Sequence, residues 1–243
     1  MDFSAPEVLA LAFAIAVAAG AVRGITGFGG ALVMTPPLAL LFGPTVAVPV
    51  ALLLESVVAA PMLVHTRREM RLAVVGPILA TACVTVPLGA YVLGAADPQW
   101  LRRGIAGIVI VFSLLLLRGW RYHGRQRLPA SIGVGALSGV MGGATSLAGP
   151  PVILYLLSGP DPIATTRANL TLFVAVISLA ALVALWTTGI LGWPATLTGL
   201  VLAPAYFGGL VAGTRAFSRF NDIRFRQFTL LLMIAVSTGI LLA

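Results

Sequence analysis

The chain has 243 residues, of which 59% are hydrophobic and 9% charged, and it carries a net charge of +8 at pH 7. Its mean hydropathy of +1.05 and its repeated apolar runs are typical of a polytopic membrane protein, and they leave almost no room for a soluble domain. All 15 basic residues are arginines, concentrated in short loops between apolar runs. This placement favours anchoring at the surface of a lipid bilayer and argues against binding to nucleic acid.

Ten apolar segments follow one another, five in each half of the chain. They span about 7–24, 31–42, 44–65, 72–94 and 100–119, then 130–142, 147–157, 163–187, 194–213 and 224–243. Three of them, 31–42, 130–142 and 147–157, hold only about 11 to 13 residues and are too short to cross a hydrocarbon core of ~30 Å. We expect these three to be half-helices, re-entrant or strongly kinked, with their backbone ends facing protein or water.

Two glycine-rich stretches, 20–30 and 135–143, resemble each other, and each leads to a Pro-Pro pair. The glycines at 20, 24 and 27 of the first match those at 135, 139 and 142 of the second. Glycine weakens a helix by about 1 kcal/mol relative to alanine, so such clusters inside apolar segments need a reason. We interpret them as breaks in membrane helices that form a substrate site. The alternative is that they only permit close helix packing, as small-xxx-small patterns do.

The similarity between the halves extends beyond the glycines, with a period near 118 residues, which is the offset between Glu55 and its counterpart Phe173. It divides the chain into a first membrane repeat at 1–119, a basic linker at 120–128 and a second repeat at 129–243. An odd number of crossings in each half gives the two halves opposite orientations, even if each glycine-broken pair is a re-entrant hairpin. The sequence therefore predicts an all-α integral membrane protein with two inverted-topology repeats, each containing a glycine-broken pair of short or half-helices.

The arginines predict the orientation in the membrane. The loops at 65–71, 118–127 and 214–226 hold most of them and fall on one side, which should be the cytoplasmic side. Arg102 and Arg103 are the exception. Because the N-terminus has no basic region before its first apolar run, we expect that run to be a retained span and not a cleaved signal peptide. Both termini are then predicted to be extracytoplasmic.

Paired glycine-rich stretches that end in proline, two similar halves, a basic middle linker and a length near 250 residues resemble the sulfite exporter TauE/SafE family. The motifs that carry the resemblance run from Gly24 to Pro37 and from Gly139 to Pro151, and the resemblance covers essentially the whole chain. It implies a permease of a bacterial or archaeal inner membrane for sulfite, organosulfonates and related sulfur compounds.

Half-helix N-termini are suited to bind such an anion. They present unpaired N–H groups and about half a positive charge, and two of them, beginning near Gly30 and Leu147, would meet near the middle of the membrane. Hydroxyl groups and glycines at the same places would complete the site. We predict substrate contacts from Arg23, Thr26, Gly27, Gly29, Gly30, Gly142, Gly143, Thr145, Ser146 and Gly149.

Three charged residues lie within or near apolar segments, where a charge is costly. Arg23 adjoins the first break and is the best candidate for a direct anion contact, with an interfacial anchor as the alternative. Glu55 lies near the middle of 44–65, and we predict that it couples transport to protons or pairs with Arg23; a packing hydrogen bond is the alternative. Arg167 is predicted to be a gate or second anion contact, or else an anchor.

No catalytic set, metal-ligand spacing or nucleotide-binding loop is evident, and the lone Cys83 lies in apolar surroundings, which favours a packing role. We therefore expect neither an enzyme nor a cofactor. The leading prediction is a secondary transporter that exports a small sulfur-containing anion by alternating access. An anion channel, an uptake permease for sulfonates or thiosulfate, a membrane-embedded enzyme and an accessory subunit are alternatives. Proton coupling and a homodimer stay open.

Overall fold

The computed structural model describes residues 6–120, 122, 126–217 and 222–242. These residues form ten α-helices and one 3₁₀ turn, and no strand occurs among them. The helices are α1 (Pro6–Thr26), α2 (Gly30–Phe42), α3 (Pro44–Thr66), α4 (Leu72–Ala95), α5 (Pro98–Leu117), α6 (Leu128–Thr145), α7 (Gly149–Leu156), α8 (Ile163–Thr187), α9 (Trp193–Phe217) and α10 (Asp222–Leu242). Arg121, Arg125 and Arg219 of the predicted cytoplasmic loops lie outside the described residues, as do the side chains of Arg224 and Arg226.

Seven of the helices (α1, α3, α4, α5, α6, α8 and α9) are long and apolar enough to cross a membrane by length and composition. Proline or glycine stands next to the start of most helices, as expected because proline is favoured in the first turn of a helix and glycine is more costly inside one. The predicted all-α membrane fold, with ten apolar segments close to the predicted positions, is confirmed.

The short helices are where sequence and structure differ. α2 has 13 residues and α7 has 8, so they rise only about 20 Å and 12 Å, as predicted. The prediction that 130–142 is also a short segment is wrong, because α6 continues to Thr145 and has 18 residues. Gly142 and Gly143 stay helical since both are tightly packed against neighbouring residues, and such tertiary contacts outweigh the low helix propensity of glycine.

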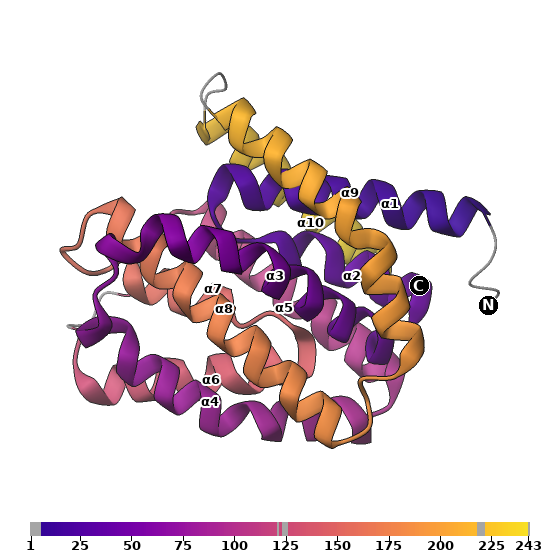
Figure 1. The fold of residues 1–243 in the computed structure, drawn as a ribbon, viewed down its shortest axis with the longest axis horizontal. Coiled ribbons are helices and arrows are strands. Elements are labelled where there is room, and N and C mark those ends of the chain that lie inside the picture. Colours follow the sequence, from indigo (N-terminus) through magenta and orange to yellow (C-terminus); the bar gives the residue numbers. More distant parts are fainter. Residues whose placement is uncertain (1–5, 121, 123–125, 218–221, 243) are drawn as a thin grey trace.

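The helices pair across the two halves (Figure 1). α1 packs along α9 on one flank of the molecule, α4 packs along α6 on the opposite flank, and α3 and α8 lie side by side between them. The first helix of each half thus packs against the fourth helix of the other half. α2 and α7 lie inside this frame, next to α3 and α8 respectively. This exchange of partners is the arrangement that an in-plane two-fold axis between the halves would produce.

Close packing explains several of the repeated glycines. A Cβ atom on Gly24 would lie 2.4 Å from the Leu210 carbonyl oxygen of α9, and one on Gly143 would lie 2.3 Å from the Val86 carbonyl oxygen of α4. Gly24 therefore corresponds to Gly143. The sequence comparison had matched it with Gly139 instead. The predicted register is wrong by four residues, about one helical turn, which leaves the glycines on the same helix face.

Candidate anion site

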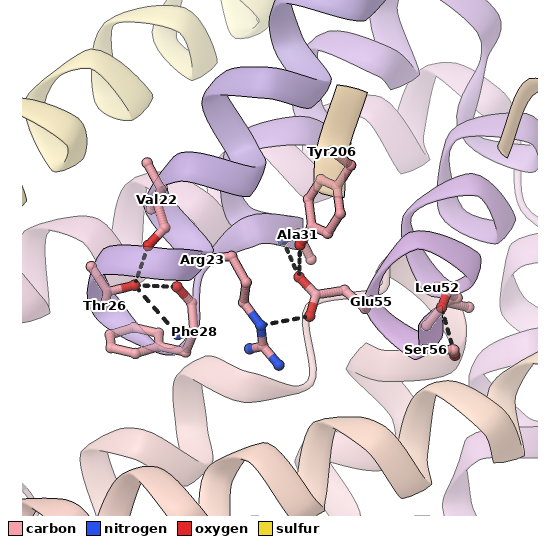
Figure 2. A network of polar contacts seen from close by, with 9 residues as sticks. All are labelled: Val22, Arg23, Thr26, Phe28, Ala31, Leu52, Glu55, Ser56 and Tyr206. Carbon is pink, nitrogen blue, oxygen red and sulfur yellow. Dashed lines mark hydrogen bonds and ion pairs between the residues drawn. The ribbon is translucent and has the colours of Figure 1, made fainter. Parts of the chain in front are cut away.

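The first half is broken between α1 and α2. Gly27 and Gly29 have φ values of 78° and 89°, a left-handed conformation that favours glycine, and Phe28 lies between them. The hydroxyl of Thr26, the last residue of α1, donates to the Val22 carbonyl at 2.8 Å and accepts from the Phe28 N–H at 3.3 Å. It also contacts the Phe28 carbonyl oxygen. One hydroxyl therefore holds both the end of α1 and the peptide groups of the break (Figure 2).

The second half is broken between α6 and α7 in a similar way. The Thr145 hydroxyl donates to the Met141 carbonyl at 2.7 Å and accepts from the Leu147 N–H at 3.4 Å. Ser146 follows with a φ of 61° and is the one described non-glycine residue with positive φ. Its hydroxyl lies 2.8 Å from that of Thr35 on α2, and both groups are buried. This hydrogen bond joins α2, the helix that follows the first break, to the second break.

A narrow cavity lies between the two breaks, and it leaves about 30 Å³ for the centres of water molecules. Since one water needs roughly 10–15 Å³ by this measure, the cavity is sized for very few small groups. α2 and α7 both begin beside it, at Gly30 and Gly149. Gly29, Ser146 and Gly149 contribute to its wall together with Arg23 and Glu55. The other lining residues are Phe28, Ala31, Leu32, Leu52, Leu147, Ala148, Pro150, Val174, Ile177 and Ser178.

Arg23 and Glu55 form an ion pair in this wall. Their exposed fractions are 0% and 3%, and the Arg23 Nε atom lies 3.3 Å from Glu55 Oε2. The other carboxylate oxygen, Oε1, accepts the Ala31 N–H at 3.0 Å and the Tyr206 hydroxyl at 2.9 Å (Figure 2). The carboxylate of Glu55, which belongs to α3, thus lies at the first turn of α2, a position where a helix favours an anion. The predicted pairing of Glu55 with Arg23 is confirmed.

The guanidinium of Arg23 is incompletely satisfied. Its Nε and Nη2 atoms are buried without a hydrogen-bond partner, as is Glu55 Oε2, because the contact between the two side chains lacks hydrogen-bond geometry. A buried donor without an acceptor costs about 1–3 kcal/mol, and more when it is charged. The cavity beside Arg23 therefore has donors available for the oxygens of a small anion. The interfacial anchor considered for Arg23 does not fit its complete burial.

The remaining predicted contacts lie outside the cavity wall. Thr26 and Thr145 use their hydroxyls within the breaks, as described above. Gly142 packs against Ala148 and Ile177, and a Cβ on Gly30 would collide with the Tyr206 hydroxyl. Gly27 faces Arg167, and Gly143 faces α4. Of the ten predicted substrate contacts, Arg23, Gly29, Ser146 and Gly149 line the cavity.

Tyr206 and Phe28 are the residues that sequence reasoning missed. Tyr206 is 1% exposed and completes the polar cluster from α9. It follows Pro204 in an otherwise apolar span, and a phenolic hydroxyl in such a span needs a buried partner, which is the signal that points to it. Phe28 stands inside the glycine-rich stretch as its one aromatic side chain.

Arg167 lies on the other side of the first break. Its Nη2 donates to the Ile25 carbonyl at 3.3 Å, and a Cβ on Gly27 would lie 2.8 Å from its Nε. Arg167 lines a second, larger cavity of about 260 Å³, together with Thr166 of α8 and Trp120 at the start of the linker. It is therefore placed near the first break and is not part of the Arg23 cluster.

The comparison with protein families agrees with this geometry. A family model described as sulfite exporter TauE/SafE matches residues 12–240, nearly the whole chain. The protein belongs to the TauE/SafE sulfite exporter family. No curated protein and no solved structure matches it. As a member of the TauE/SafE family, the protein is a multi-pass membrane transporter of sulfur-containing anions.

Proposed function

We propose that this TauE/SafE protein exports a small sulfur-containing anion, such as sulfite or an organosulfonate, and that Arg23 holds the anion in the cavity between the two breaks. The observation that carries the proposal is the buried guanidinium whose Nε and Nη2 atoms lack acceptors. Sulfite and sulfonates offer three oxygens on sulfur, and charge-assisted hydrogen bonds to such oxygens are among the strongest available in proteins.

Glu55 has two effects on this site. Its carboxylate offsets the charge of Arg23 while the site is empty, which limits the cost of burying a cation in the membrane. It also competes with the substrate for the guanidinium, so that the anion binds loosely enough to leave. When the anion neutralises Arg23, Glu55 faces only the Ala31 N–H and the Tyr206 hydroxyl. Uptake of a proton by Glu55 would then couple transport to the pH gradient.

Alternating access would move the two flanks of the molecule relative to each other. Each flank holds one helix from 1–119 and one from 129–243, α1 packed along α9 in the first and α4 packed along α6 in the second, so each pair would move as a unit. The Thr35–Ser146 hydrogen bond and the Arg71–Asp161 ion pair also connect the two halves. These contacts are candidates to break and re-form during transport.

We further propose a plasma-membrane location with the linker in the cytoplasm and both termini outside, as the arginine-rich loops indicate. The membrane potential then favours export, because the free energy of an anion falls by about 2.3 kcal/mol per charge per 100 mV when it leaves an inside-negative cell. Uptake would need coupled cations or protons.

Reconstituted liposomes distinguish the candidate functions. Loaded with unlabelled sulfite, they should accumulate labelled sulfite transiently by exchange, with saturable kinetics, and thiosulfate, sulfate and sulfoacetate added outside will rank the substrates. An anion channel would give non-saturating flux without exchange. Measuring the same exchange with and without a pH gradient tests proton coupling, and sulfite that does not exchange at any gradient would overturn the proposed substrate.

A further inference from the structure

Phe28 is the one residue, among those that the structure describes, that lines both the cavity of Arg23 and the cavity of Arg167. On one side lies the narrow cavity of Arg23. On the other lies the 260 Å³ cavity of Arg167, whose lining includes Gly119 and Trp120 at the end of α5 and Ile163 at the start of α8. That wider cavity is therefore at the end of the molecule that carries the linker.

The backbone holds Phe28 at this boundary. The Thr26 hydroxyl accepts the Phe28 N–H (Figure 2), and Phe28 is flanked by two glycines with positive φ. Glycines at these positions can change conformation at little steric cost, so the segment combines a fixed resting position with a capacity to move. The side chain is half-buried, as expected at the border of a cavity.

We propose that the Arg167 cavity is the vestibule through which the anion reaches the site from the linker face, and that Phe28 is the barrier between this vestibule and Arg23. This rests on the proposed anion transport. An apolar ring cannot replace the water around an anion, so it stops the anion unless the ring moves. Arg167 supplies the positive charge that concentrates anions in the vestibule.

The second break carries the counterpart of this barrier. Leu147 stands directly after Ser146, as Phe28 stands after Gly27, and its N–H is held by Thr145 in the same way that Thr26 holds Phe28. Leu147 lines the central cavity and is 1% exposed. Leu147 is thus the positional counterpart of Phe28.

Cysteine accessibility tests the barrier without depending on the substrate. In a Cys83→Ser background, Ser178→Cys places a thiol on the central cavity, and a negatively charged, membrane-impermeant methanethiosulfonate is applied from one face of oriented vesicles. The exposed Arg118→Cys reports the sidedness of each preparation. Phe28→Ala should speed labelling of Ser178→Cys from the linker face by about ten-fold or more and leave the rate from the opposite face unchanged.

Matched variants make the result decisive. Phe13→Ala removes another half-buried phenylalanine, from α1, and should label like the parent. Phe28→Leu should label at an intermediate rate, and it replaces Phe28→Ala if that variant does not fold. Parent-like labelling of the Phe28 variants, equal acceleration from both faces, or the same acceleration in Phe13→Ala would overturn the assignment.

A second arm tests the vestibule. Arg167→Gln should slow labelling of Phe28→Ala/Ser178→Cys by the anionic reagent by about ten-fold and leave labelling by a neutral reagent unchanged. Equal effects on both reagents would contradict a role of Arg167 in concentrating anions. If the accessibilities change as expected but Arg23 variants still exchange sulfite, the path stands and the Arg23 site falls.

Discussion

The two breaks share a backbone design but differ in chemistry. Each ends its first helix with a threonine that bonds back to the carbonyl four residues earlier and accepts the N–H two residues later. Each of these threonines is followed by a residue with positive φ, Gly27 in the first break and Ser146 in the second. The backbone geometry of both breaks is thus produced by the same local interactions.

The charged groups among the described residues that line the central cavity, Arg23 and Glu55, both come from the first half. Counted from the helix ends, Arg23 corresponds to Gly142, and Glu55 corresponds to Val174 and not to Phe173, the counterpart that the sequence comparison predicted. The counterpart of Tyr206 is Ala82, because the Tyr206 carbonyl oxygen lies against Gly20 of α1 as the Ala82 carbonyl oxygen lies against Gly139 of α6. A similar frame therefore surrounds an asymmetric site, which has its cation and its carboxylate on the α1–α3 side and a serine on the α6 side.

The largest expected effect comes from removing the cation of the first break. Arg23→Gln should lower sulfite exchange in liposomes by at least about 100-fold, because it removes the only charge in the cavity that is complementary to the anion among the described lining residues. Arg103→Gln, on the exposed surface of α5, is the matched control and should transport like the parent.

Removal of Arg23 also leaves Glu55 buried without a counter-charge, which costs about 3–5 kcal/mol and endangers folding. Arg23→Gln/Glu55→Gln should regain stability, measured as thermal unfolding in detergent, without regaining exchange. Exchange near the parent rate in the double variant would mean that the pair is structural.

The next largest effect concerns the packing that both breaks share. Gly143→Ala places a Cβ 2.3 Å from the Val86 carbonyl oxygen and should destabilise the protein by about 1–3 kcal/mol. Gly24→Ala should cost a similar amount on the opposite flank, since the contacts correspond. Gly133→Ala, on the same helix with no atom within 4 Å, should instead stabilise by up to about 1 kcal/mol. Thermal unfolding of the three variants checks this, and unequal costs for Gly24 and Gly143 would break the equivalence.

A smaller effect is expected from neutralising Glu55 alone. Glu55→Gln keeps a carbonyl oxygen to accept the Ala31 N–H and the Tyr206 hydroxyl but removes the competing charge beside Arg23. Sulfite should bind about ten-fold more tightly, and the response of exchange to a pH gradient should disappear. Equilibrium binding and exchange at several gradients measure the two effects. A variant that keeps its pH response would remove Glu55 from proton coupling.

The smallest effect tests the link between the breaks. Thr35→Val deletes one buried hydroxyl of the Thr35–Ser146 pair and should destabilise by about 1 kcal/mol. Thr198→Val, whose exposed hydroxyl bonds only to Pro194 within α9, should change thermal unfolding very little. If both variants unfold alike, the hydroxyl pair does not hold the breaks together.

The sequence predicted the helices, the break after α1 and the position of Arg23 beside it because these depend on local properties. The second break was predicted too early, at the glycines of 135–143, which stay helical within α6. Apolar run length, proline and glycine set the helix ends. An arginine beside a break inside the membrane avoids the lipid by facing the protein interior. It did not predict that Thr26 and Thr145 bond within their own breaks, since a hydroxyl can bond back to its helix or outward equally well. Nor could it place Tyr206 against Glu55, which depends on how α9 crosses α1. The one-turn error in aligning Gly24 arose because glycines spaced by four residues match in either register.

The most direct test of the account is to locate the bound anion. Selenite is a heavier oxyanion of the same shape as sulfite, and its anomalous scattering in crystals of the protein marks its position. The account predicts a single strong peak between the two breaks, within hydrogen-bond distance of the Arg23 guanidinium and next to Ser146, and its loss in Arg23→Gln/Glu55→Gln. A peak that persists in that variant, or a peak at Arg167 with none in the central cavity, would contradict it.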